Sequence, residues 1–186
     1  MNEYYSIDDI LSEDENVDVI THIDATNLGW LDPNCNCQDL PKNSKIKIPI
    51  WLAKGLKEKN MVSVEVPEFY FDTQLLAAAH SVNLKTKSNY FFEAGYKIYE
   101  LTKVEELRIN LIKIFSSLRF KRLVNHSLHF VCKNAINFWK DLTNLEKKIF
   151  CYGQDAAKDH LEFKTRKHVL LKSKIYVNKK RKYNNL

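Results

Sequence analysis

Glycine is scarce in this sequence, with only four among 186 residues. None of them stands in the spacing G-x-x-x-x-G-K-[ST] or G-x-G-x-x-G, so no loop is predicted to cradle phosphates with its backbone N–H groups. A nucleotide-driven motor is therefore disfavoured. The serines and cysteines also lack any signature of a catalytic nucleophile. We predict that the protein is not an enzyme, with no catalytic residue and no cofactor.

Metal ligands are poorly represented as well. Cys35 and Cys37 are spaced C-x-C, but the sequence has no second pair of cysteines to match them. Neither a structural zinc site nor a disulfide framework is therefore predicted. His126 and His129 are spaced to share one helix face, yet no aspartate or glutamate lies within ten residues on either side of the pair. Ordinary surface histidines are the simpler interpretation, and we expect no metal. The four cysteines are Cys35, Cys37, Cys132 and Cys151.

Long apolar runs are missing too. None approaches the roughly eighteen residues that a membrane span needs. The acidic start MNEYYSIDDI lacks the basic-then-apolar layout of a secretory signal. Both features indicate an intracellular protein with no membrane partner. The hydrophobic share of 45% is enough for a packed core.

Positive charge is absent from the first part of the chain. Residues 1–41 carry ten acidic side chains and no lysine or arginine. Residues 42–186 carry all 29 basic residues against 13 acidic ones, a formal charge of +16. A basic body is typical of nucleic-acid binding, but an acidic segment in the same chain favours protein partners with patterned surfaces.

The first third of the chain predicts a small β-rich module. A helix over 7–14 is expected behind a capping box formed by Ser6 and Asp9. Strands are predicted over 17–23, from Trp30, over 45–48 and over 61–66, with a loop at 32–44. Pro49 has no N–H to donate, so the strand must stop there, and a short helix over 50–58 follows without a loop.

After Pro67 the hydrophobic period becomes helical. Asp72 is predicted to cap a short helix that reaches Ala79, and 82–88 are irregular. Longer helices are predicted over 89–102, 103–124, 126–139 and 143–163, the last opened by a T-x-x-E capping box. A final apolar stretch covers 169–177. The predicted fold class is α+β, mostly α: a β-rich domain with an acidic N-terminal helix over 1–66, an all-helical domain over 67–178 and a basic tail over 179–186.

The helix predicted over 103–124 is apolar on two sides. One stripe has the width of a normal core face, and the second is separated from it by Arg108 and Arg119. Such a helix lies either at the centre of its own bundle or against another chain, and the sequence leaves both open. The first stripe consists of Leu107, Leu111, Ile114, Phe115 and Leu118, and the second of Ile109, Ile112 and Phe120.

Two neighbouring segments, IPIWLAKGL (48–56) and VSVEVPEFY (62–70), resemble subunit three of the eukaryotic GINS complex, the Psf-three family of a replication-fork assembly. NCNCQDLPKN (34–43) matches no family motif, so no role is carried over to Cys35 or Cys37. Other segments resemble the family in the same order along the chain: YYSIDDIL (4–11), NYFFEAG (89–95), LIKIFSSLRFKRLVNHS (111–127), LEKKIFCYGQDAAKDHLEF (145–163) and YVNKKRKY (176–183).

The resemblance implies a role as well as a fold. It implies a non-catalytic scaffold subunit of a heterotetramer whose four related subunits join chiefly through their helical domains. That GINS complex joins the Mcm ring and the Cdc-forty-five protein to form the replicative DNA helicase, active in initiation and fork progression. The expected partners are the three other GINS subunits, the Mcm ring and the Cdc-forty-five protein. The expected location is the nucleus, with DNA contacted only indirectly through the assembly.

Three sets of candidate site residues follow. The strand-to-helix corner is predicted to pack the β-rich domain on the helical one, with Trp51 and Leu52 wedged between them; it consists of Ile48, Pro49, Ile50, Trp51 and Leu52. The candidate intersubunit contacts are Ile109, Ile112 and Phe120. The candidate electrostatic contacts are Glu13, Asp14, Glu15, Arg108, Arg119 and Arg122.

A second hypothesis makes the chain an independent basic nucleic-acid-binding helical protein, whose DNA affinity would fall steeply with salt. No helix-turn-helix or zinc-finger spacing supports it. The run KKRK at 179–182 is compatible with a nuclear-import signal, a phosphate contact or a solvated tail. Besides this run, the hypothesis would use Arg108, Arg119, Lys121 and Arg122.

Overall fold

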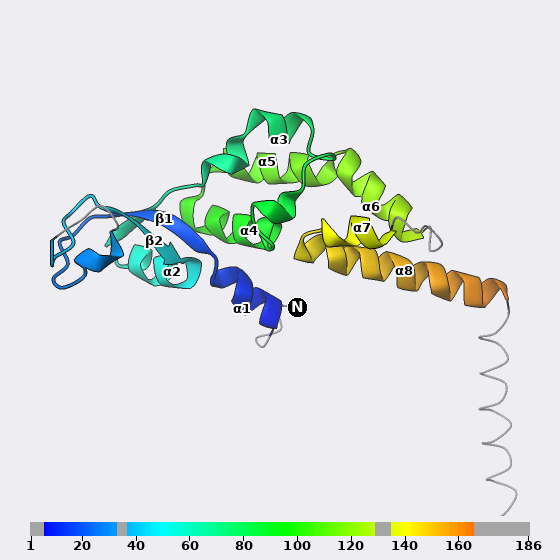
Figure 1. Ribbon diagram of the computed structural model, residues 1–186, viewed down its shortest axis with the longest axis horizontal. Coiled ribbons are helices and arrows are strands. Elements are labelled where there is room, and N and C mark those ends of the chain that lie inside the picture. The colour runs from blue at the N-terminus through cyan, green and yellow to red at the C-terminus, as the bar shows by residue number, and fades with distance from the viewer. Residues whose placement is uncertain (1–5, 33–36, 129–134, 166–186) are drawn as a thin grey trace, which may run out of the picture.

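A small antiparallel sheet near the N-terminus is followed by helices, which confirms the predicted α+β, mostly α fold class (Figure 1). The computed structural model describes residues 6–32, 37–128 and 135–165. Its elements are α1 (Ile7–Glu13), β1 (Asn16–Thr21), β2 (Lys45–Pro49), α2 (Ile50–Glu58), β3 (Val62–Val64), α3 (Thr73–Ala77), α4 (Phe91–Thr102), α5 (Glu105–Ser116), α6 (Leu118–Leu128), α7 (Ala135–Lys140) and α8 (Asn144–Lys164), with short 3-10 turns at Gly29–Leu31, Glu68–Phe71 and Leu84–Thr86.

The sheet has the strand order β2-β1-β3, with antiparallel pairing on both sides of β1. Val19 of β1 lies opposite Ile46 of β2 and Val64 of β3. Alternate residues of β1 and β2 are buried, as the period-2 pattern predicts, so one face of the sheet belongs to the core.

The strand predicted from Trp30 is wrong. Residues Gly29–Leu31 form a 3-10 turn, and Trp30 is 76% exposed. The Gly29 N–H donates to the Gln38 carbonyl oxygen at 3.0 Å, and a Cβ on Gly29 would lie 2.0 Å from the Cys37 carbonyl oxygen. The Gly29 N–H is thus bonded to a neighbouring loop segment and is not available to pair with a strand of the sheet.

The corner between β2 and α2 forms where it was predicted, but Trp51 is not buried in it. Ile48 and Ile50 are almost fully buried, and Leu52 packs against the core. Trp51 is 54% exposed, because Ile50 and Ala53 define the inward face of α2 and residue 51 is rotated about 100° from residue 50. The prediction that Trp51 is wedged between two domains is therefore wrong.

The main core is continuous from the sheet to α5. It extends along the chain from Val17 to Ile114 and includes Tyr70 and Phe91, whose ring centroids are 4.8 Å apart. The Tyr70 hydroxyl donates to the Phe91 carbonyl oxygen at 3.0 Å, and its burial raises the pKa of the phenol. Buried residues before and after Pro67 thus share one cluster. The domain boundary at Pro67 stays a prediction.

The single helix predicted over 103–124 is in fact two helices that meet at Ser117. The Ser117 hydroxyl donates to the Ile114 carbonyl oxygen at 2.9 Å and accepts from the Arg119 N–H at 3.3 Å. Such side-chain bonds compete with the helical backbone bonds. Leu118 is consequently 58% exposed instead of belonging to the core stripe. The predicted helix start at 126 is wrong as well, since α6 continues to Leu128.

A second, smaller core joins α6, α7 and α8. Leu123, Leu142 and Phe150 are buried there, and the ring of Trp139 stands edge-on to Phe150 at 5.6 Å. In Figure 1 this part lies at the opposite end from the sheet, and α8 extends away from the body. The apolar stretch at 169–177 and the basic tail at 179–186 lie outside the described residues.

Three predicted capping signals at helix starts can be compared with the structure. At α8 the Thr143 N–H donates to Glu146 Oε2 at 3.0 Å, so the predicted capping box is confirmed. At α1 the Ser6 side chain makes no capping bond, so the box predicted with Asp9 is wrong. The Asp72 cap is confirmed, because its carboxylate accepts from the Gln74 N–H at 2.9 Å.

Candidate functional site

The second apolar stripe predicted for helix 103–124 faces outward. Ile109 and Ile112 on α5 are 47% and 54% exposed, and Phe120 on α6 is 39% exposed. The inward stripe behind them is occupied by Leu107 and Ile114, which are fully buried. Within the described residues α5 is therefore not enclosed by its own bundle, and this side is open to a partner. The role of these three residues as intersubunit contacts stays a prediction.

An apolar groove lies between α4 and α5, directly beside Ile112. Its volume is about 360 Å³. The rings of Phe92 and Phe115 meet edge-on in its wall at 5.5 Å. Tyr96 on α4 forms part of the opposite rim and is 58% exposed. The sequence pattern did not single out this groove, because it arises only when α4 and α5 pack together. Its remaining lining residues are Tyr99, Arg108, Leu111, Ser116 and Leu145.

Arg108 is the charged residue among those that line this groove, and it is held by a short network. The Tyr99 hydroxyl donates to Glu105 Oε1 at 2.9 Å, and Arg108 Nη1 lies 3.3 Å from Glu105 Oε2. The hydrogen bond from Tyr99 is the main cause that lowers the pKa of the Glu105 carboxyl, and the hydrogen bond from Arg108 is the second. Arg108 is still 57% exposed, so it can also meet an external carboxylate.

The acidic helix α1 turns its charges toward its own chain. Lys97 Nζ on α4 lies 2.6 Å from Asp9 Oδ1 and 3.1 Å from Glu13 Oε1. Lys148 Nζ on α8 lies 2.7 Å from Asp8 Oδ2, and this hydrogen bond lowers the pKa of the Asp8 carboxyl. The helix is thus held by ion pairs to two other helices.

These pairs change the interpretation of the predicted electrostatic contacts in the acidic arm. Glu13 is engaged by Lys97, and Glu15 Oε1 accepts from the Ser88 hydroxyl at 2.8 Å. Asp14 is exposed at the end of α1. Of the three acidic residues predicted to meet a partner, two are therefore already bound within the chain. The side of α1 that faces solvent is instead apolar, with Ile7, Ile10 and Leu11 exposed.

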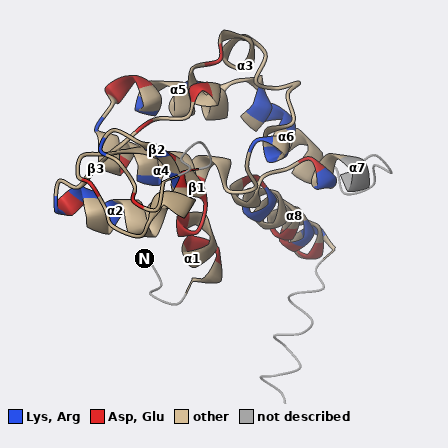
Figure 2. Cartoon of the chain, turned by 60° about the vertical axis from the view of Figure 1, so that its left-hand side comes forward, with Lys and Arg blue, Asp and Glu red and all other residues tan. Residues whose placement is uncertain are grey.

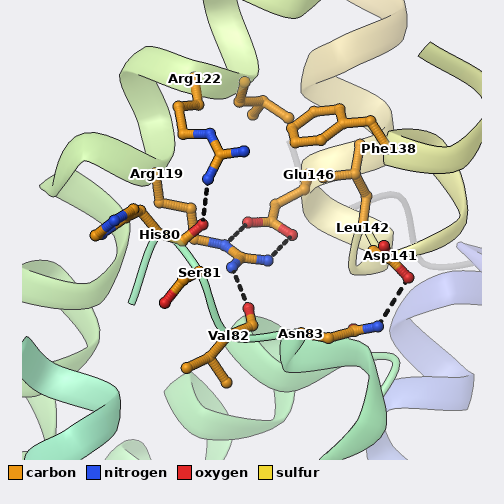
Figure 3. Close-up of a pocket in the computed structure, with 11 residues that line it drawn as sticks. His80, Ser81, Val82, Asn83, Arg119, Arg122, Phe138, Asp141, Leu142 and Glu146 are labelled. Carbon is orange, nitrogen blue, oxygen red and sulfur yellow. Dashed lines mark hydrogen bonds and ion pairs between the residues drawn. The ribbon is translucent and has the colours of Figure 1, made fainter. Parts of the chain in front are cut away.

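Arg119 is buried, contrary to its predicted role as an electrostatic contact. Its guanidinium binds the Glu146 carboxylate through both nitrogens Nε and Nη2, and its side chain is 11% exposed against 2% for Glu146 (Figure 3). Nη1 donates to the carbonyl oxygens of Ala79 at 2.9 Å and Val82 at 2.7 Å. Arg119 therefore fixes α8 to α6 and to the segment after α3.

Arg122 lies one turn further along α6 and is exposed. Its Nη1 donates to the His80 carbonyl oxygen at 2.8 Å, at the edge of a cavity of about 130 Å³ (Figure 3). On the far side of this cavity the Asn83 amide donates to Asp141 Oδ1 at 2.8 Å. Arg122 can still contact a partner, and that role stays a prediction.

Possible metal ligands lie apart from one another in the part of the chain that the structure describes. No three of its His, Cys, Asp or Glu residues come together as metal ligands. The ring of His126 packs on Phe138 at 4.5 Å, whereas His129, Cys35 and Cys132 lie outside the described residues.

None of the helices in the described ranges has the length and apolarity to cross a membrane. Lysines and acidic residues are interspersed along α8 (Figure 2).

Comparison with known proteins finds similarity to PSF3 proteins, both in one domain and along most of the chain. Residues 5–58 match the PSF3 N-terminal domain. The protein named "Probable DNA replication complex GINS protein PSF3" from Dictyostelium discoideum is 27% identical over 88% of this chain, which spans 62% of that relative's length. "DNA replication complex GINS protein PSF3" from Xenopus laevis is 26% identical over 97% of this chain and 90% of the relative. The Homo sapiens protein of the same name is 27% identical over 84% of this chain and 77% of the relative.

Proposed function

Because this chain belongs to the PSF3 family of GINS proteins, we propose that it is a non-catalytic scaffold subunit of a heterotetrameric GINS complex that acts in DNA replication. Its direct partners are the three other GINS subunits. Through them it joins the Mcm ring and the Cdc-forty-five protein in the nucleus and contributes to the replicative helicase. ATP hydrolysis belongs to the ring, and DNA is contacted only through the assembly.

The observation that carries this proposal is the apolar groove between α4 and α5. Ile112 and Tyr96, which line it, are about half exposed, and so is Ile109, one turn before Ile112 on α5. Removing each of these side chains from water on assembly is worth about 1 kcal/mol, half of the value for a fully buried residue. Several such contacts made at once favour an obligate subunit, because each one raises the effective concentration of the next.

The rival hypothesis of an independent nucleic-acid-binding protein loses one of its main contacts. Arg119 is neutralised by Glu146 and withdrawn from solvent. Arg108 is paired with Glu105, which leaves Lys121, Arg122 and the basic tail to bind phosphates. The loss of Arg119 from the predicted phosphate-binding set favours protein partners over DNA.

Light scattering tests the proposal directly. The chain is expressed alone and then together with the three other GINS subunits. We expect the chain alone to aggregate at the high concentrations used for light scattering, and to form a one-to-one-to-one-to-one particle on co-expression. A stable monomer that ignores the other subunits would refute the scaffold role.

A pair of substitutions localises the interface. Ile112→Glu places a charge beside the α4–α5 groove and should abolish or strongly reduce incorporation into the complex. Ile23→Glu is the matched control, because Ile23 is 45% exposed but follows β1, away from the groove. Equal incorporation of both variants would place the interface elsewhere.

A further inference from the structure

A second groove, distinct from the one between α4 and α5, is lined by two large aromatic side chains that are exposed. Trp51 on α2 is 54% exposed and Tyr96 on α4 is 58% exposed. The groove lies between α1, α2 and α4 and has a volume of about 680 Å³, with the buried Ile50 among its lining residues. Exposed tryptophan and tyrosine are the residues most enriched at the energetic centres of binding sites. The described residues leave about half of each side chain uncovered.

The charges that line this groove are mainly negative. Two of its lysines are already occupied, because Lys97 pairs with Asp9 and Glu13, and Lys57 Nζ donates to the Leu101 carbonyl oxygen at 2.5 Å. The lining set contains Asp9, Glu13, Glu58, Glu93 and Glu100 against Lys54, Lys57 and Lys97.

Two carboxylates of the groove remain available to a ligand. Glu100 is exposed and accepts a hydrogen bond from the Tyr96 hydroxyl, which raises the pKa of that phenol. Glu58 is exposed at the end of α2, and among the described residues it has no ion-pair partner within 4.0 Å. A net acidic lining is notable in a chain of formal charge +6.

We propose that this groove binds a lysine or arginine side chain from a basic segment of a protein partner. The cation lies against the ring faces of Trp51 and Tyr96, where the quadrupole of an aromatic ring attracts it. Glu58 and Glu100 supply the opposite charge. The site is separate from the α4–α5 groove and does not depend on the scaffold function, although Tyr96 contributes to both surfaces.

A fluorescence-anisotropy titration tests this site. The full chain is titrated into a fluorescein-labelled heptapeptide in which glycine alternates with arginine and lysine, at low salt. A matched peptide with glutamate at the charged positions serves as the negative probe. We expect binding of the basic peptide alone, weakened about tenfold by Trp51→Ala and retained in large part by Trp51→Phe.

Three further variants make the result specific. Trp30→Ala is the matched control, because Trp30 is 76% exposed but does not line the groove, and it should leave the affinity unchanged. Glu100→Gln should weaken binding, and Lys54→Glu should strengthen it. Circular dichroism confirms that each variant is folded. Equal affinity of the Trp51→Ala and Trp30→Ala chains, or equal binding of both peptides, overturns the proposal.

The basic residues 179–182 of the chain itself are a competing source of the cation. Deletion of residues 179–186 in the same titration separates the two sources. Unchanged peptide affinity supports a partner segment as the occupant. A several-fold gain in affinity shows that the chain's own tail competes for the groove, which overturns the assignment to a partner.

Discussion

Removal of Arg119 should destabilise the chain more than removal of any exposed arginine. Arg119→Met keeps much of the side-chain length and apolar stem, but it deletes the guanidinium. Glu146 then remains buried with its negative charge balanced only by the donors of its own capping box at Thr143. The carbonyl oxygens of Ala79 and Val82 lose their donor at the same time.

The expected cost is about 3–5 kcal/mol, the range found when one partner of a buried ion pair is removed. A domain of this kind has a total stability of about 5–15 kcal/mol, so the loss is a large share of it. Replacing both partners, as in Arg119→Met with Glu146→Gln, removes the unpaired charge. We expect this double variant to be more stable than Arg119→Met alone, and its loss of stability to be smaller than the sum of the losses of the two single variants.

Urea denaturation followed by circular dichroism and by tryptophan fluorescence, in a Trp30→Phe, Trp51→Phe background that leaves Trp139 as the reporter, measures this effect. Trp139 is a local reporter, because its ring packs on Phe150 in the core shared by α6 and α8. Arg122→Met is the matched control, one turn along the same helix and exposed, and should cost less than about 1 kcal/mol. If the midpoints of Arg119→Met and Arg122→Met were shifted equally, the assignment of Arg119 to a buried structural pair would be refuted.

Two other predictions follow from the same structure. Gly153→Ala in α8 would place a Cβ 2.2 Å from Ser127 Oγ and 2.7 Å from Ser127 Cβ, so it should cost about 1–3 kcal/mol in thermal or urea unfolding. Gly55→Ala in α2 meets nothing within 4 Å and should instead stabilise by up to about 1 kcal/mol; the opposite order would contradict the close α6–α8 approach. Glu93 is partly buried with neither carboxylate oxygen hydrogen-bonded in the described chain, and this burial raises its pKa above the ordinary 4.5. The native state therefore binds more protons than the unfolded state above pH 4.5, so this residue lowers stability as the pH rises through its folded pKa. Glu93→Gln should raise the melting temperature at pH 7 but not at pH 4, whereas an equal change at both values, or one matched by the exposed Glu100→Gln, would exclude this cause.

The elements that the sequence predicts best are those with strong local signals. The helix over 50–58 is found at those bounds because Pro49 ends the strand and occupies the extended N-cap position before Ile50. The capping box at Thr143 likewise fixes the start of α8 within one residue. In both cases the deciding interactions lie within four residues, where sequence patterns carry their full information.

The predictions that failed depend on contacts between distant residues. Arg119 and Glu146 are 27 positions apart, and no periodicity in either helix indicates that they form a pair. The break at Ser117 involves no glycine or proline, so the apolar pattern continued through it. The family resemblance predicts that Trp51 lies inside, but the inward face of α2 is set by Ile50 and Ala53.

The strand order of the sheet has a consequence for how this chain avoids unwanted association. With β1 in the centre, β2 and β3 are both edges, and an unpaired edge can template a strand from another molecule. The β2 edge carries the exposed Lys45 and Lys47 and ends at Pro49, and β3 is three residues long with Pro67 soon after it. Charge, brevity and proline each discourage strand addition. Partners are therefore directed to the helices, and the chain can be held at high local concentration in an assembly without its sheets joining edge to edge.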